Sequence, residues 1–226
     1  MTMGAGSALR LCAAIALALT FQLAPVMGAD VGAGTVSRTE ALEGLRAPDV
    51  EVRRKSSLGL GSSGEMDDVP ALIESLRDDD ELVRAIAQRS IWAIWSRSGD
   101  AQTDLLFEQG AEEMANGNLK AAVATFTRII ERAPAFAEGW NKRATALFLL
   151  GELDASARDC DEVLALNPLH FGALSGYGLI ETRRGRLESA LAYFQRALAL
   201  NPNLVGVSDN VDSVRRALAK RRMQDT

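Results

Sequence analysis

An interval of 34 residues governs the second half of this 226-residue chain and limits what it can fold into. Three prolines and three glycines mark the interval, at Pro134, Pro168, Pro202, Gly117, Gly151 and Gly185. Each glycine is followed two residues later by leucine. A fixed period of this length is typical of repeat proteins, in which each repeat is one supersecondary unit.

The residue types at the marked positions indicate two helices in each repeat. Glycine supplies the backbone freedom that a tight turn between two helices needs. Proline ends the second helix, because it lacks an N–H donor and its predecessor avoids the α region. Helix formers dominate the composition, and runs of alternating β-branched residues are missing. One hairpin cannot bury its apolar face alone, so we expect stacked hairpins in an all-α solenoid.

Residues 103–202 resemble three tetratricopeptide repeats (TPRs). The resemblance places the units at 103–136, 137–170 and 171–204. The stretches WNKRATALFLLGELDASARDC and NPLHFGALSGYG are also similar to those of exported bacterial TPR proteins. What the resemblance implies is a concave surface, lined by the first helix of each repeat, that takes up peptides or partner helices.

The last segment, residues 205–226, is predicted to form a capping helix and tail. Its apolar stripe shields the final repeat and consists of Val211, Val214 and Leu218. Its end is basic and carries Arg215, Arg216, Lys220, Arg221 and Arg222. These cations suit a helix C-terminus, and contact with anionic lipid or an acidic partner is the alternative.

A second, weaker repeat precedes the TPR-like segment. Two half-similar stretches align at an offset of 31 residues, which pairs Asp49 with Asp80 and Arg53 with Arg84. Each aspartate stands four residues before its arginine, so we expect the two side chains to meet on one helix face. The pattern over residues 39–99 resembles HEAT-like repeats, which are also stacked helices.

The first of these stretches contains three glycines with the spacing of a dinucleotide-binding turn, Gly59, Gly61 and Gly64. That turn requires a buried strand before it and a helix opening from it. A charged, helix-like stretch precedes the glycines instead. We therefore expect a loop between repeats rather than a nucleotide site.

The N-terminus has the layout of a secretory signal peptide. A short leader ending at Arg10 precedes a run of apolar residues, and small residues follow, which predicts cleavage near Gly28–Ala29. Residues 1–29 are thus expected to be removed and residues 30–38 to form a flexible linker. The mature protein would be periplasmic, and an uncleaved anchor is the alternative. Cys160 would then be the single cysteine, so no internal disulfide could form.

Candidate chemical groups are few. His170, the only histidine, is expected in an exposed link between repeats, and Cys160 is expected to be buried. Trp92 and Trp95 are predicted to pack where the two repeat types join, with a ligand-stacking pair as the alternative. No nucleophile–base pair or metal-ligand spacing is present, which argues against an enzyme and predicts no cofactor. A net charge of −5 gives no support to a nucleic-acid role.

The TPR resemblance allows one specific partner to be tested. TPRs that clamp a C-terminal carboxylate place lysine, asparagine and arginine on their inner face. The matching positions here are Phe107, Ala111, Lys142, Gly172 and Gly176. This clamp is absent, so recognition of chaperone tails is not expected.

The predicted partner-binding groove is instead a mixed trough that could admit a helix or an extended segment. Its residues are Phe107, Met114, Asn141, Thr145, Phe148, Leu149, Ser175, Leu179 and Arg183. The alternative is that some of them only pack against the capping helix. The function expected is a non-catalytic scaffold or assembly factor for an unidentified protein or peptide. The alternative is an accessory subunit of an envelope enzyme, tethered through the basic C-terminal helix.

Overall fold

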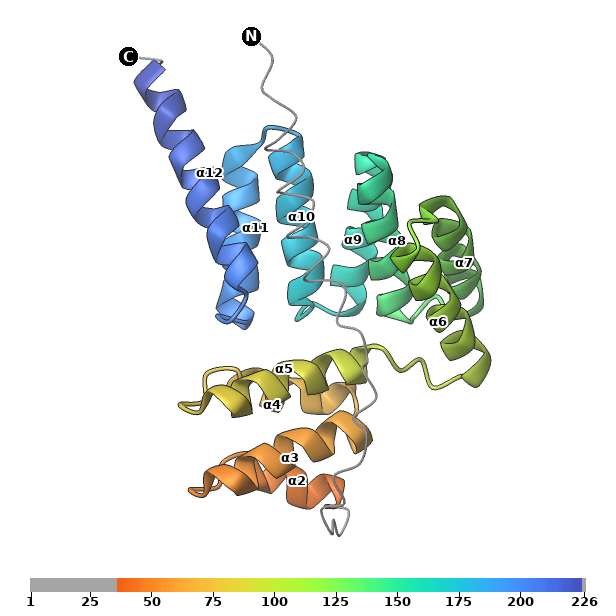
Figure 1. The fold of residues 1–226 in the computed structure, drawn as a ribbon, viewed down its shortest axis with the longest axis vertical. Helices are drawn as coiled ribbons and strands as arrows, with labels where there is room; N and C mark the ends of the chain where they lie inside the picture. Colours follow the sequence, from red (N-terminus) through yellow and green to blue (C-terminus); the bar gives the residue numbers. More distant parts are fainter. Residues whose placement is uncertain (1–35, 225–226) are drawn as a thin grey trace. The chain divides into compact units, whose positions relative to one another are not determined.

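The computed structural model describes residues 36–224, and every regular element in that range is helical (Figure 1). The predicted signal peptide and most of the predicted linker lie outside the described residues. The N-terminal elements are α2 (Arg38–Gly44), α3 (Val50–Ser63), the short 3-10 helix η1 (Met66–Asp68), α4 (Val69–Ser75) and α5 (Glu81–Trp95). The later helices are α6 (Ala101–Ala115), α7 (Leu119–Arg132), α8 (Ala137–Leu150), α9 (Leu153–Leu166), α10 (Phe171–Arg183), α11 (Leu187–Leu200) and α12 (Val205–Gln224).

The later helices form three antiparallel hairpins and a cap. α6 pairs with α7, α8 with α9 and α10 with α11, and α12 packs on α11. The turn glycines Gly117, Gly151 and Gly185 have φ of +76°, +85° and +73°, which confirms the predicted conformation of the turns. Each second helix ends two residues before its periodic proline. The predicted all-α solenoid is confirmed.

The capping helix buries the stripe that the sequence predicted. Val211, Val214 and Leu218 are all buried, together with Val207. They belong to the same apolar cluster as Phe194 and Ala197 of α11. α12 therefore covers the apolar face that the third hairpin would otherwise expose.

Close packing inside each hairpin depends on a pair of facing positions. A Cβ added to Gly110 would lie 2.8 Å from the Phe126 ring, and one added to Gly178 would lie 2.4 Å from the Phe194 ring. The middle hairpin has Ala144 and Cys160 at these positions in the 34-residue register. A larger residue on the second helix thus accompanies a smaller one on the first helix, as close packing requires.

The N-terminal elements form two further hairpins, with α2 against α3 and α4 against α5. Asp49 and Asp80 cap α3 and α5, accepting hydrogen bonds from the N–H groups of Glu51 and Val83. The expected pairing of each aspartate with the arginine four residues later is wrong, because the capping geometry turns the carboxylate toward the backbone.

Each arginine instead binds the loop that precedes its own helix. Arg53 donates to the Ala47 and Pro48 carbonyls, and Arg84 donates to the carbonyls at the equivalent positions, Asp78 and Asp79. Arg53 also forms a two-point ion pair with the Asp78 carboxylate, at 2.7 and 2.9 Å. The 31-residue offset is therefore visible in the hydrogen bonding. That these hairpins are HEAT-like stays a prediction.

The glycine-rich stretch is helical, which corrects the expectation of a loop. α3 continues through Gly59 and Gly61 and ends at Ser63, with Gly64 as its C-cap. A Cβ at Gly61 would lie 2.6 Å from the Ser90 hydroxyl oxygen. Close approach of α5, rather than a turn, accounts for this glycine.

Candidate functional site

The first helices of the three hairpins are neighbours, since α6 contacts α8 and α8 contacts α10. The predicted groove residues fall into columns separated by the 34-residue period. One column is Phe107, Asn141 and Ser175, another is Ala111, Thr145 and Leu179, and a third is Ala115, Leu149 and Arg183. Residues at matched positions of stacked helices share one face, so the three columns form a common inner face.

The predicted groove residues differ in solvent exposure. Phe107, Met114, Thr145, Leu149, Ser175 and Leu179 are partly exposed, and Arg183 is exposed. Asn141 and Phe148 are buried, each with 5% of its surface exposed. The accessible part of the inner face is therefore narrower than the predicted groove.

Arg183 covers Phe148. Its guanidinium lies 4.0 Å from the centre of the phenylalanine ring and donates a 3.0 Å hydrogen bond to the Phe148 carbonyl. Stacking of a guanidinium on an aromatic ring combines cation–π attraction with burial of the ring. Arg183 is therefore the exposed side chain of the pair, and the Phe148 ring lies beneath its guanidinium.

Asn141 belongs to a buried polar cluster centred on Glu138. Its Nδ2 donates to both Glu138 carboxylate oxygens at 3.1 Å, and Lys142 Nζ lies 3.5 Å from Glu138 Oε1. Burial opposes the charged form of Glu138, but Lys142, His170 and Asn141 outweigh it and hold the pKa of Glu138 below its ordinary value. The carboxylate is therefore ionised inside the protein and holds the start of α8 to its neighbours.

His170 is part of the same cluster, and the expectation of an exposed link is wrong. Its side chain is fully buried, with Nε2 2.9 Å from Glu138 Oε2. The Ala173 N–H donates to His170 Nδ1 at 3.0 Å, which caps α10. Nδ1 is thus an acceptor, so the proton of the neutral ring lies on Nε2 and points to Glu138.

The two tryptophans of α5 complete this cluster. Trp95 stacks on the His170 ring at 4.3 Å between centroids, and Trp92 meets the edges of His170 and Phe171 at 5.5 Å each. Trp95 is buried and Trp92 partly buried. The predicted packing of the two tryptophans between the N-terminal and TPR-like segments is confirmed. The TPR-like hairpin that they contact is the third one.

This packing closes one end of the inner face. A Cβ on Gly172 would lie 2.7 Å from the Trp92 ring, so α5 occupies the inner side of α10 near its first turn. Further contacts secure the same junction. Arg77 donates to the Ala199 and Leu200 carbonyls, and Asn203 donates to the Leu76 carbonyl at 2.7 Å. The accessible inner face therefore lies toward the C-terminal end of α10.

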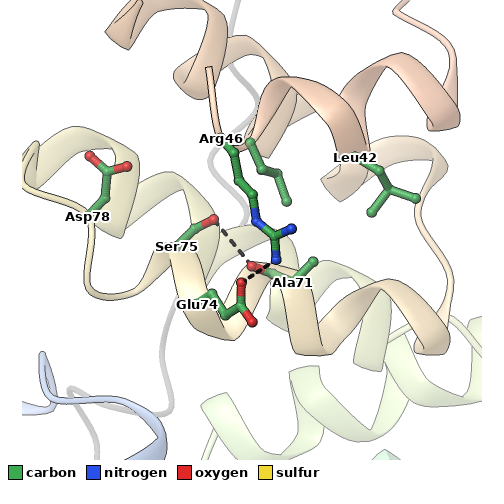
Figure 2. Close-up of a pocket in the computed structure, with 7 residues that line it drawn as sticks. Leu42, Arg46, Ala71, Glu74, Ser75 and Asp78 are labelled. Atoms are coloured by element: carbon green, nitrogen blue, oxygen red, sulfur yellow. Dashed lines mark hydrogen bonds and ion pairs between the residues drawn. The ribbon is translucent and has the colours of Figure 1, made fainter. Parts of the chain in front are cut away.

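A separate hollow of about 320 Å³ lies among the N-terminal hairpins (Figure 2). Its lining consists of Leu42, Leu45, Arg46, Ala71, Glu74, Ser75 and Asp78. Arg46 pairs with Glu74 at 2.8 Å, and the Ser75 hydroxyl donates to the Ala71 carbonyl at 3.3 Å. Because these polar groups are paired with their own neighbours, the hollow presents no convergent set of donors for a ligand.

Within residues 36–224, no helix is both long and apolar enough to cross a membrane. In the same range, no three histidine, cysteine or acidic side chains gather into a possible metal site. Cys160 is buried as predicted, and burial raises the pKa of its thiol to about 12. The thiol is therefore protonated at neutral pH and is a poor nucleophile.

Comparison with known proteins finds likenesses for the C-terminal hairpins. A tetratricopeptide repeat family model matches residues 107–168 and 155–204. A TPR repeat-containing protein of Rhizobium etli is 32% identical over 128 residues, which is 57% of this chain and 63% of that protein. Human RNA polymerase II-associated protein 3 is 26% identical over 155 residues, 68% of this chain and 23% of that protein. The chain thus spans less than two thirds of either relative.

Two solved structures resemble the chain over about half its length. The first TPR of Spaghetti (RPAP3), bound to the HSP90 peptide SRMEEVD, has 27% identity and a TM-score of 0.51, covering 53% of this chain and 96% of that chain. The Sgt2 TPR domain from Aspergillus fumigatus has 19% identity and a TM-score of 0.53, covering 55% and 83%, and shows likeness of fold alone. Residues 107–204, which span most of α6 and all of α7 to α11, therefore match the tetratricopeptide repeat model and share the fold of solved TPR domains.

Proposed function

We propose that the protein is a non-catalytic interaction scaffold whose TPR inner face binds a segment of another protein. The observation that carries this proposal is the set of matched columns on α6, α8 and α10, which leaves Thr145, Leu149, Leu179 and Arg183 accessible on one face. A row of apolar and small polar side chains on stacked helices suits a bound helix or extended segment. That the Spaghetti TPR carries a peptide supports the same use of the fold.

The partner that this face suits is not a chaperone tail held by its terminal carboxylate. Lys142 already pairs with Glu138 and lies 5.9 Å from the Phe107 ring centre. Gly172 is covered by Trp92. The remaining face offers leucine side chains and one stacked arginine, so we propose a partner that presents apolar side chains and an acidic group beside them.

Site-specific photo-crosslinking in cells tests this proposal. A photoreactive residue at Leu149 or Leu179 should give discrete crosslinked species, because both positions face the proposed partner. The same residue at Arg158 or Glu162, exposed on the second helix α9, is the matched control. Equal crosslinking at all four positions, or crosslinking at the control positions alone, would reject the inner face as the binding surface.

We further propose that the protein is exported to the bacterial periplasm after cleavage near Gly28–Ala29. The support is the leader, apolar run and small-residue boundary of the first 29 residues. Mass spectrometry of the envelope fraction should find a mature N-terminus at Ala29 or Asp30. An intact Met1 in the cytoplasmic fraction contradicts export.

A further inference from the structure

The C-terminal end of α12 is a strongly basic surface that the inner face does not use. Five cations stand between residues 215 and 222, and the sequence has no acidic residue between Asp212 and Asp225. Leu218 is the last buried residue of the helix, and all of residues 219–224 are exposed. The helix therefore extends past its packing contact with α11 and carries its charge into solvent (Figure 1).

The exposed cations are arranged around the end of the helix rather than along a cleft. Arg216 and Lys220 are four residues apart and share the face turned away from the buried stripe, and Met223 falls on the same face. Met223 is 80% exposed. An apolar side chain is thus placed among basic ones at the very end of a helix.

The turn between α10 and α11 adds to this surface. Arg221 donates a 3.3 Å hydrogen bond to the Gly185 carbonyl, which fixes the end of α12 against the turn. Arg186, beside that glycine, is 65% exposed and lies 3.6 Å from Glu181, whereas Arg184 is paired with both Glu181 and Asp154. We name the surface formed by Arg186, Arg216, Lys220, Arg221 and Met223 the basic tip.

We propose that the basic tip docks the protein onto an anionic phospholipid bilayer. Five cations stand within residues 215–222 with no acidic residue among them, on a protein whose net charge is −5, so this end would be attracted to an anionic surface. A projecting helix end suits a flat surface, and Met223 can enter the headgroup region while the cations contact phosphates. Binding of an acidic protein partner at the same cations is the competing outcome that the test must separate from lipid binding.

Vesicle flotation with the full-length protein tests the proposal. The probes are vesicles of phosphatidylcholine alone and vesicles with about 30% phosphatidylglycerol. We expect binding to the anionic vesicles, lost when the salt concentration rises from about 0.05 to about 0.5 M. The triple variant Arg216→Gln/Lys220→Gln/Arg221→Gln should lower this binding by at least about tenfold.

A matched variant separates local from total charge. Lys120→Gln/Arg128→Gln/Arg158→Gln removes three exposed cations from α7 and α9 and should keep the wild-type affinity. The apolar run near the N-terminus is common to all variants, so the dependence on headgroup charge is the decisive readout. Circular dichroism should show that both variants remain folded.

Three results overturn the proposal. One is equal binding to neutral and anionic vesicles, and another is an equal loss in both triple variants. The third is binding of a glutamate-rich peptide that the basic-tip variant loses, in a protein that does not float with anionic vesicles. That third result would assign the basic tip to an acidic protein partner.

Discussion

Glu138 and His170 meet 2.9 Å apart in a region closed to solvent, although 32 residues separate them in the sequence. The histidine ring donates to the carboxylate with one nitrogen and accepts the Ala173 N–H with the other. The first turns of α8 and α10 are thereby joined through one buried pair.

Truncating this pair should be costly and non-additive. Glu138→Ala leaves the His170 donor buried without its partner, so we expect a loss of about 2–4 kcal/mol in the free energy of unfolding. His170→Ala should cost a similar amount, and the double variant should cost less than the sum by about 1–3 kcal/mol. Urea unfolding of the four proteins measures this coupling. Glu162→Ala, on the exposed side of α9, is the control and should be neutral; additive losses for the pair would contradict the contact.

The facing of Gly178 and Phe194 predicts a second stability effect. Gly178→Ala places a methyl group 2.4 Å from the present position of the ring and should destabilise by about 1–3 kcal/mol. In a Phe194→Leu background the same change should cost less, because the smaller side chain leaves room. Gly206→Ala is the control, since no atom lies within 4 Å of its added Cβ. Thermal melts measure the stability of these variants. If Gly178→Ala lowers the melting temperature equally in the wild-type and Phe194→Leu backgrounds, overpacking against the ring is not the cause.

At Gly151 the stability cost of a substitution should come from the backbone conformation rather than from a lack of space. Its φ is +85° and nothing lies within 4 Å of an added Cβ. Gly151→Val should therefore cost about 1–2 kcal/mol through the left-handed conformation alone. Gly151→Asn should cost less, since asparagine tolerates this region better. Denaturant midpoints that rank valine equal to or above asparagine would contradict the proposed cause.

Asp80 predicts a dependence of stability on acid pH. Its carboxylate accepts from Arg54 and from the Val83 N–H, and these bonds lower its pKa to about 2. A group whose pKa falls on folding contributes above its unfolded value of about 3.9, and the contribution disappears as the pH falls toward 2. Asp80→Asn can still cap α5 but loses the charge, so its stability should fall less steeply between about pH 4 and pH 2. If the free energy of unfolding of variant and wild type falls with the same slope in that pH window, the Asp80–Arg54 ion pair does not contribute to stability.

The repeat architecture was predictable because its determinants are local and periodic. Each turn glycine and each terminating proline acts within a few residues of itself, and Val211, Val214 and Leu218 follow one helical stripe. The 34-residue register also predicted which positions of the first helices match, whereas their assignment to an inner face came from the resemblance to TPRs.

Other features depend on which distant segments meet. The burial of His170 requires both Glu138 and Trp95, and no local pattern reveals that α5 packs against the third TPR-like hairpin rather than the first. Phe148 was predicted to line the groove, but Arg183, one hairpin further along, covers its ring. The loop expected at Gly59 and Gly61 was wrong because glycine is favoured both in turns and where two helices approach closely, and composition does not distinguish the two.

The contacts of Arg77 and Asn203 join parts of the chain separated by 122 to 127 residues. Most repeat proteins can fold outward from any repeat, since each one touches only its neighbours. Here the N-terminal hairpins gain their last partners only from the segment that follows α11. A chain that ends before Asn203 therefore leaves the Leu76 carbonyl without this donor, and the N-terminal hairpins depend on a segment at the far end of the array.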